Sequence, residues 1–406
     1  MRTIKILVTG GGSSGHISPA LAIIKTIGEL AEGADWRPQF RYIGGTRGIE
    51  RQQISAAGID FVGVATGKLR RYFSLENLTD LFRIPVGVAQ SLREVARFRP
   101  AVVLSTGGYV GVPTVLAAYL LRVPILTHEQ TVQVGLANRI SARFATTIAL
   151  TFESARQELP AAQRGKAIVT GNPVRPLIFG GDGAAAAHWA GFARADDRLP
   201  TIYVTGGSQG ARIINRAVEA ALPELLAFCR IIHQCGQQPD GQQQDYDRLE
   251  QAATQLPPEL RRRYYFTRFV GVEIKDVFAL ADLVVGRAGA GTIAEICVLG
   301  KPALYIPLVP TGGDEQTRNA QACAVAGAAT IIAQAELSGA RLLAELQTLL
   351  ADRARLDAMG QAALTLGRPD AARAVAEAVL ALAGVGNRQA TTSISDEPPR
   401  RLDTKA

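Results

Sequence analysis

The sequence predicts an α/β protein of two domains, each built on a doubly wound parallel sheet. A chain of 406 residues is longer than a usual single domain. Short apolar runs that end in glycine clusters alternate with segments of helical character, which is typical of parallel sheets covered by helices. The same pattern starts again at Thr201, so we expect two such sheets along the chain.

The first half is expected to contain six strands. The run 4–9 ends at the glycines 10–12, and the helix after it is expected to begin at about Pro19, because proline suits a first helical turn. Most of the other apolar runs also end at glycine or polar residues. These further strands are expected at 40–43, 102–105, 125–127, 148–150 and 167–169.

The second half is expected to contain five strands and a helix from about Ala211. The strands are expected at 201–205, 231–234, 283–285, 303–306 and 330–332. Proline and glycine concentrate between Gly171 and Asp182, which places the domain join there. We therefore expect domains at 1–175 and 176–367, a C-terminal helix at about 368–384 that could pack back onto the first domain, and a disordered tail at 385–406.

The composition is basic and poor in aromatic residues. A net charge of +8 and a pI near 9.5 favour nucleic acid, phosphate-bearing substrates or an acidic membrane surface as partners. The four cysteines lack the spacing of metal ligands and are expected to be reduced, although Cys229 and Cys235 could pair. Since no apolar run has transmembrane length and the N-terminus lacks a signal-peptide pattern, we expect a cytoplasmic protein whose membrane contact is peripheral.

The first glycine loop offers an anion site and a candidate base. It reads Gly-Gly-Gly-Ser-Ser-Gly-His over residues 10–16, between a strand and a helix. Glycine lets the backbone approach a ligand, and free amides at a helix start bind anions. The spacing fits neither the GxGxxG fingerprint nor the phosphate-binding lysine loop. His16 would lie at the carboxyl edge of the sheet, where it could take a proton from a hydroxyl or only cap the helix.

Three stretches of the second half could hold a nucleotide and a sugar. Ser208 and the amides of the glycine loop 206–210 could hold a diphosphate. Glu295 follows the small residues 288–292 at a helix start, where a carboxylate could accept both ribose hydroxyls. Gln316 could bind sugar hydroxyls, although a polar helix start capped by Asp314 explains the same residues.

Two stretches of the first half also group polar residues after strands. His128 opens the segment 128–131 and Arg175 ends the segment 171–175. Arg175 could reach a phosphate, or it could form an ordinary surface ion pair. His128 could equally be a buried histidine whose hydrogen bonds are satisfied within the fold.

Taken in order, these stretches resemble the MurG family of peptidoglycan glycosyltransferases. The resemblance covers roughly residues 3–382, and the order and spacing of its segments make the set specific. The matching segments are Gly-Gly-Gly-Ser-Ser-Gly-His-Ile-Ser-Pro-Ala (10–20), Ser-Thr-Gly-Gly-Tyr-Val-Gly-Val-Pro (105–113), His-Glu-Gln (128–130), Gly-Asn-Pro-Val-Arg (171–175), Gly-Gly-Ser-Gln-Gly-Ala (206–211), Arg-Ala-Gly-Ala-Gly-Thr-Ile-Ala-Glu (287–295) and Gln-Thr-Arg-Asn-Ala (316–320).

This resemblance implies a GT-B fold, in which two Rossmann-like domains with parallel sheets face a cleft. It implies an inverting transfer of N-acetylglucosamine from UDP-N-acetylglucosamine to lipid I, the undecaprenyl-pyrophosphoryl-N-acetylmuramoyl-pentapeptide, to give lipid II for peptidoglycan. His16 is then the candidate base or a residue of the acceptor loop. The residues assigned to substrates by resemblance are Ser13, Ser14 and Gly15 at the donor and acceptor cleft, Thr131 on the acceptor side or near the sugar, Arg175 and Ser208 at the donor diphosphate, Val270 at the uracil, Ala290, Gly291, Thr292 and Glu295 at the nucleoside, and Gln316 at the N-acetylglucosamine.

Some positions depart from the family pattern. Ser13 and Ser14 replace a threonine and a glycine, Thr131 replaces an asparagine, and Glu315 stands where histidine or glutamine is common. Because these positions lie on the acceptor side or near the sugar, a related transferase that uses another glycolipid or a small molecule as acceptor stays open.

The expected mechanism is a single displacement. His16 takes the proton of the acceptor hydroxyl, while Ser208, Arg175 and helix-start amides stabilise the leaving UDP. No Asp-x-Asp motif stands at a strand end, so no tightly bound cofactor is expected and a divalent cation would be accessory.

The segment 67–84 mixes cations with bulky apolar residues. It could insert into an anionic leaflet and hold the protein on the cytoplasmic face of the membrane, or it could be a basic loop before an amphipathic core helix. Binding of nucleic acid is disfavoured because aromatic residues are few and cations are dispersed. An NAD-dependent oxidoreductase is disfavoured by the missing fingerprint.

Overall fold

The computed structural model describes residues 1–46, 48, 50–67, 75–192, 199–237, 244–309 and 314–385, with side chains at all of these except 14 and 75–82. The chain forms two compact units. Unit 1 contains residues 1–175 and the returning segment from Arg368, and unit 2 contains Pro176–Gly367. Of the predicted membrane segment, residues 68–74 lie outside the described residues, and so does the predicted tail from residue 386.

Unit 1 is built on a seven-stranded parallel sheet with the order β3-β2-β1-β4-β5-β6-β7. Its strands are β1 (Arg2–Thr9), β2 (Trp36–Gly45), β3 (Asp60–Val64), β4 (Val102–Ser105), β5 (Ile125–Glu129), β6 (Thr147–Leu150) and β7 (Ala167–Val169). Its helices are α1 (Ser14–Leu30), α2 (Glu50–Ala56), α3 (Leu75–Phe98), α4 (Val112–Leu120), α5 (Leu136–Phe144), α6 (Ala155–Glu158), α7 (Ala161–Arg164) and α18 (Ala371–Leu382).

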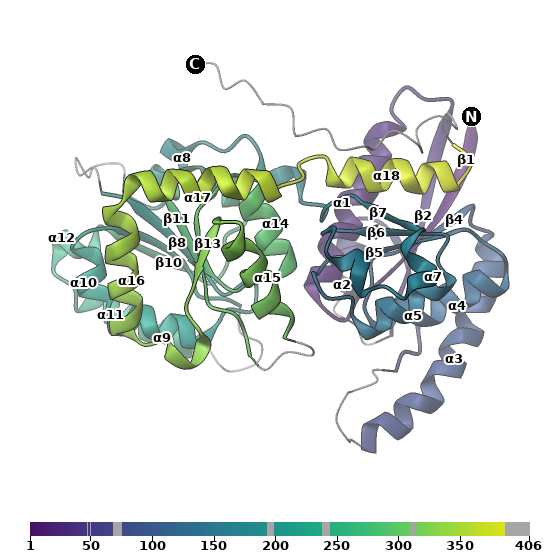
Figure 1. Cartoon of the computed structure of the whole chain (residues 1–406), viewed down its shortest axis with the longest axis horizontal. Coiled ribbons are helices and arrows are strands. Elements are labelled where there is room, and N and C mark those ends of the chain that lie inside the picture. Colours follow the sequence, from purple (N-terminus) through teal and green to yellow (C-terminus); the bar gives the residue numbers. More distant parts are fainter. Residues whose placement is uncertain are drawn as a thin grey trace. The chain divides into compact units, whose positions relative to one another are not determined.

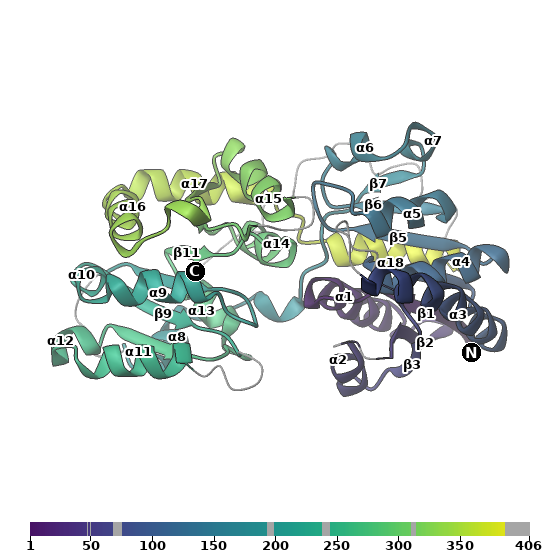
Figure 2. The same ribbon diagram turned by 90° about the horizontal axis from the view of Figure 1, so that it is seen from below.

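Apolar side chains alternate along these strands and form a core on each face of the sheet, as a doubly wound sheet requires. One core receives Ile23 and Ile27 of α1 and Val375 and Val379 of α18. Helices α3, α4 and α5 cover the other face. Figure 2 shows α18 lying beside α1, against which it packs directly. The C-terminal helix is therefore part of the core of unit 1.

Unit 2 is built on a six-stranded parallel sheet with the order β10-β9-β8-β11-β12-β13. Its strands are β8 (Thr201–Thr205), β9 (Arg230–Gln234), β10 (Tyr264–Thr267), β11 (Leu283–Gly286), β12 (Ala303–Tyr305) and β13 (Ala329–Ile331). Its helices are α8 (Gly183–Trp189), α9 (Arg212–Ala220), α10 (Leu222–Leu226), α11 (Gln244–Thr254), α12 (Pro258–Arg261), α13 (Ile274–Leu280), α14 (Ala290–Val298), α15 (Glu315–Val325), α16 (Gly339–Ala351) and α17 (Arg353–Leu366). Helices α9, α10 and α16 contribute to the core on one face of the sheet, and α8, α13, α14 and α15 to the core on the other. Figure 1 labels all of these helices except α13, which is labelled in Figure 2.

The predicted fold class of two Rossmann-like parallel sheets is confirmed, and every predicted strand is present. Two edge strands, β3 and β10, were not predicted. The predicted start of the first helix at Pro19 is wrong, because α1 begins at Ser14 and Pro19 lies inside it. Ser13 is extended and ends the glycine loop directly before the helix, so the loop and not the proline sets the helix start. His16 consequently belongs to the first turn of α1.

Candidate functional site

Each sheet has a point where the strand order reverses, between β1 and β4 in unit 1 and between β8 and β11 in unit 2. Ligands of doubly wound proteins bind beyond the carboxyl ends of the strands at this point. Four loops follow these four strands. We call them the β1 loop (10–13), the β4 loop (106–111), the β8 loop (206–211) and the β11 loop (287–289). Three of the four contain predicted site residues or lead directly into them.

The β1 loop has a backbone that only glycine adopts readily. Gly10, Gly11 and Gly12 have φ angles of 150°, 144° and 86°. A Cβ atom at Gly12 would lie 2.7 Å from Cε1 of Tyr109, and one at Gly11 would lie 2.8 Å from Cδ of Glu50. The Gly11 amide also donates to the Gly107 carbonyl at 3.3 Å, so the β1 and β4 loops are held together.

His16 is oriented by the β4 loop. Its Nδ1 lies 2.9 Å from the carbonyl oxygen of Thr106, and the Thr106 hydroxyl donates to the His16 carbonyl at 2.8 Å. A carbonyl can only accept, so Nδ1 carries the proton and the neutral ring keeps its lone pair on Nε2. The Gln130 amide donates to the same Thr106 carbonyl at 3.0 Å and lies 3.1 Å from Nδ1. This arrangement presents Nε2 as a base.

Burial lowers the pKa of His16, and this effect exceeds three opposing ones. The Thr106 carbonyl and the charges of Glu129 and Glu50 all favour the protonated ring. Because the net shift is downward from 6.5, His16 is neutral at neutral pH and can accept a proton there.

Glu129 is a buried carboxylate that organises the loop after β5. Only 4% of the residue is exposed. Its Oε1 accepts from the Thr131 amide at 3.0 Å and lies 2.9 Å from the Thr131 hydroxyl, while Oε2 accepts from the Gly135 amide at 3.1 Å and from Asn138 at 2.9 Å. The predicted acceptor residue Thr131 is therefore buried, and its side chain is engaged with Glu129 and with the Gln133 carbonyl at 2.7 Å.

The other polar residue of this segment, His128, has a structural environment. It is fully buried, its Nε2 donates to the Gly171 carbonyl at 3.0 Å, and burial lowers its pKa to about 4. Gly171 packs closely against Arg368. A Cβ atom added at Gly171 would lie 2.8 Å from Cγ of Arg368, which leaves no space for a side chain. The two chain segments that connect the units are thus side by side at this edge of unit 1.

The β8 loop of unit 2 forms a tight turn against the end of β9. The Gly210 amide donates to the Gly207 carbonyl at 3.1 Å, and the Gln237 amide donates to the Ser208 carbonyl at 2.8 Å. Gly210 has a φ of 78°, and a Cβ atom there would collide with the Cys235 carbonyl. Ser208 is partly exposed at this turn, directly before α9.

The β11 loop leads into α14, whose first three residues are Ala290, Gly291 and Thr292. Their helix-start amides have no intrahelical acceptor, and the N-cap residue Gly289 supplies no side-chain cap. Glu295 follows within the second turn and is partly buried. The four predicted nucleoside residues therefore lie on one helix start, which suits an anionic and hydroxyl-bearing ligand.

The remaining predicted residues are placed as follows. Val270 is 2% exposed, and its amide donates to Gln234 at 2.9 Å. Gln316, the second residue of α15, accepts from the Leu308 amide at 3.0 Å, which leaves its amide nitrogen to donate. Arg175 is partly buried and is the last residue of unit 1 before the chain enters unit 2. Ser13 and Gly15 are exposed beside His16, and the side chain of Ser14 lies outside the described part of the chain.

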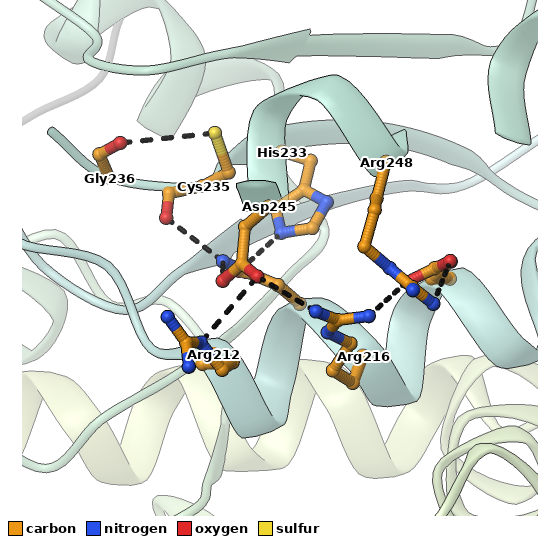
Figure 3. A network of polar contacts seen from close by, with 9 residues as sticks. Arg212, Arg216, His233, Cys235, Gly236, Asp245 and Arg248 are labelled. Atoms are coloured by element: carbon orange, nitrogen blue, oxygen red, sulfur yellow. Dashed lines mark hydrogen bonds and ion pairs between the residues drawn. The ribbon is translucent and has the colours of Figure 1, made fainter. Parts of the chain in front are cut away.

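A buried polar network that was not predicted from the sequence joins β9, α9 and α11 (Figure 3). Asp245, which is 2% exposed, accepts from Asn215 at 2.9 Å and lies 3.6 Å from Arg216 and 3.8 Å from Arg212 of α9. Asn215 also donates to the Cys235 carbonyl at 3.0 Å, and its Oδ1 lies 3.1 Å from Nε2 of His233. The network fixes the end of β9 against α9, and with it the turn that carries Ser208.

Because His233 belongs to this network, we expect the free energy of unfolding to depend on pH. Burial lowers the pKa of His233 to about 3, from 6.5 in the unfolded chain. Between these values the unfolded state binds more protons, so the stability due to the neutral ring is complete above about pH 6.5 and falls as the pH is lowered, by about 1.4 kcal/mol per pH unit. Urea unfolding at pH 7 and pH 5 measures this. We expect His233→Gln to reduce the pH slope and the exposed control His188→Gln to leave it unchanged, whereas an unchanged slope in His233→Gln contradicts the prediction.

Three features of the described residues bear on cofactors and membranes. No group of three or more His, Cys, Asp or Glu side chains in that part of the chain could hold a metal ion. The four cysteines are buried free thiols. None of the described helices combines the length and the apolar character needed to cross a membrane.

Comparison with known proteins relates these loops to a family. Residues 6–150 match the glycosyltransferase family 28 N-terminal domain, and residues 201–375 match the family 28 C-terminal domain. A relative from Bacillus anthracis, the UDP-N-acetylglucosamine–N-acetylmuramyl-(pentapeptide) pyrophosphoryl-undecaprenol N-acetylglucosamine transferase 2, is 38% identical over 85% of this chain and 91% of its own length. A Treponema pallidum transferase of the same name is 35% identical over 92% of this chain and 94% of its own.

A solved structure extends the likeness to the fold. The crystal structure of Acinetobacter baumannii MurG matches with a TM-score of 0.70 and 26% identity, over 93% of this chain and 99% of that one. Family matches to both halves of the chain and relatives above 30% identity over most of it agree with this structural match. The chain belongs to glycosyltransferase family 28 and, within it, to the MurG family of N-acetylglucosamine transferases with the GT-B fold.

Proposed function

We propose that this protein transfers N-acetylglucosamine from UDP-N-acetylglucosamine to lipid I, with inversion at the anomeric carbon, and so forms lipid II for peptidoglycan. The observation that carries the proposal is the 2.9 Å contact between Nδ1 of His16 and the Thr106 carbonyl, from which we infer that Nδ1 carries the proton. A neutral imidazole with a free lone pair on Nε2 is what deprotonation of a sugar hydroxyl requires. The names of the relatives supply the donor and the acceptor.

Within this proposal unit 1 binds the acceptor, and unit 2 binds the donor together with Arg175, the last residue of unit 1 before unit 2. The α14 start and the β8 loop offer amides to the diphosphate, and Glu295 accepts from the ribose hydroxyls. Ser208 and Arg175 stabilise the leaving UDP, and Gln316 donates its amide hydrogens to the N-acetylglucosamine. As His16 takes the proton, the charges of Glu129 and Glu50 stabilise the imidazolium that forms.

A membrane-bound acceptor requires the protein to work at a lipid surface, and we propose the cytoplasmic face of the cell membrane. Exposed apolar side chains support this. Tyr119, Leu120 and Leu121 are 53%, 61% and 41% exposed at the end of α4, and Leu136 is 43% exposed at the start of α5, which packs against α4. Arg122 follows them directly, as suits contact with an anionic leaflet.

The test is turnover of UDP-N-acetylglucosamine by the purified protein with a panel of acceptors. The panel contains lipid I, other lipid-linked sugars and soluble sugars, and UDP release is measured together with transfer of labelled sugar. Transfer to lipid I alone is expected. Transfer only to another glycolipid would support the related transferase that the changes at Ser13, Ser14 and Thr131 leave open.

A separate flotation assay tests the membrane proposal by comparing binding of the protein to vesicles with and without anionic lipid. Equal binding to both kinds of vesicle would contradict the proposal.

A further inference from the structure

Gln234, the last residue of β9, uses its whole hydrogen-bonding capacity inside unit 2. Its Nε2 donates to the Thr205 hydroxyl at 3.1 Å and to the Gly207 carbonyl at 3.0 Å. Its Oε1 accepts from the Val270 amide at 2.9 Å and from the Tyr203 hydroxyl at 3.4 Å. A primary amide has two donor hydrogens and two acceptor lone pairs, so this buried side chain is fully satisfied.

These contacts join two segments that are distant in the sequence. Gly207 belongs to the β8 loop, which is the diphosphate segment in the proposed function, and Val270 belongs to the segment proposed for the base. The Thr205 hydroxyl also accepts from the Gly207 amide at 3.1 Å, so Gln234 holds the Gly207 carbonyl directly and the Gly207 amide only through Thr205. One side chain therefore sets the distance between both segments.

We propose that Gln234 is a positioning residue of the donor site, which fixes the β8 loop and the backbone at Val270 so that a nucleoside diphosphate is bound at both ends at once. This inference rests on the proposed function. Holding two binding segments in advance spares the ligand the cost of ordering them. The hydrogen bond to Gln234 also determines which backbone group of Val270 can bind the base. The Val270 amide hydrogen is donated to Gln234, so only the Val270 carbonyl is left for a base. Uracil offers its N3–H to that carbonyl, whereas cytosine has an acceptor at N3 and a donor only at its N4 amino group, so it would have to shift to donate to the same carbonyl.

Only an amide side chain can both donate to the Gly207 carbonyl and accept from the Val270 amide. Glutamate has the same shape but no donor for Gly207, and its charge would face a carbonyl at 3.0 Å. Methionine has similar length and volume but can neither donate to Gly207 nor accept from Val270. We therefore expect both Gln234→Met and Gln234→Glu to loosen the two segments, and Gln234→Glu to have the larger effect.

The experiment measures binding of UDP and of CDP by calorimetry, without acceptor, to the full-length protein. For Gln234→Met we expect the Kd for UDP to rise about 10- to 100-fold, and the preference for UDP over CDP to shrink. In turnover the donor KM should rise while kcat at saturating donor changes little. Gln347→Met, an exposed glutamine on α16, is the matched control. Leu346→Ala, which opens a cavity in the core of unit 2, controls for lost stability and should leave the Kd for UDP unchanged.

The outcomes separate the inference from the proposed function. If the wild-type protein binds UDP and Gln234→Met binds it equally well, Gln234 has no positioning role and the inference is wrong. The same holds if Leu346→Ala raises the Kd as much as Gln234→Met at equal loss of stability, since the effect is then one of folding. If the wild-type protein binds no UDP, the proposed function fails first.

Discussion

Replacing His16 by alanine is expected to lower kcat by about 10²- to 10⁴-fold, the usual contribution of a general base. The donor KM should change little, because His16 lies in unit 1 and the proposed donor contacts of α14 and the β8 loop lie in unit 2. The physical reason is the held Nδ1–H, which leaves Nε2 to accept the proton of the acceptor hydroxyl. Steady-state turnover of UDP-N-acetylglucosamine with lipid I measures the effect.

Lys25→Ala is the control, since Lys25 is exposed on the same helix and pairs only with Glu29, at 3.8 Å, among its described contacts. The pH dependence adds a second criterion. Because burial lowers the pKa of His16, the active neutral form should persist below pH 6.5, and the acid limb of the kcat/KM profile should lie below that value. In His16→Ala this limb should disappear. A variant that keeps wild-type kcat and the same acid limb would remove His16 from the mechanism.

Replacing Glu295 by alanine is expected to raise the donor KM about 10- to 100-fold, the value of hydrogen bonds to a charged group. Glu295 lies within the second turn of α14, after the helix-start amides proposed for the nucleotide. A carboxylate can accept from both ribose hydroxyls at once, and alanine can accept from neither. The change should therefore act on the donor and leave the acceptor KM unaffected.

A comparison of UDP with 2′-deoxy-UDP tests the ribose assignment directly. The wild-type protein should prefer UDP, and Glu295→Ala should bind both with similar affinity because the group that distinguishes them is gone. Glu259→Ala, at an exposed residue of α12, should keep the wild-type preference. Unchanged discrimination in Glu295→Ala would show that another group contacts the 2′-hydroxyl.

The central strands could be predicted because buried parallel strands read as continuous apolar runs. Strands β3 and β10 lie at the sheet edges and lack this signal: β3 contains Gly63 and begins with the exposed Asp60, and β10 is mostly aromatic and only partly buried. The loop that carries Ser208 and the loops that lead into His16 and Glu295 were predictable for a related reason, since each follows an apolar run and precedes a helix.

The contacts that orient the site could not be predicted in the same way. Thr106 holds His16 because β1 and β4 are neighbours, with Thr9 paired to Ser105. Gln130 reaches the same carbonyl because β5 lies next to β4. These partners are 90 and 114 residues from His16 in the chain, and nothing near His16 in the sequence points to them. The bridge made by Gln234 depends likewise on β9 lying beside β8.

The return of α18 to unit 1 has a consequence for biosynthesis. Unit 2 is one uninterrupted segment of the chain, whereas unit 1 lacks a core helix until the segment that follows unit 2 has been made. Until then the strip of α1 and sheet that receives Val375 and Val379, both fully buried in the finished protein, stays open to water. Synthesis of unit 1 therefore begins before that of unit 2 and ends after it. A nascent chain that stalls before α18 exposes an apolar surface of the kind that chaperones recognise.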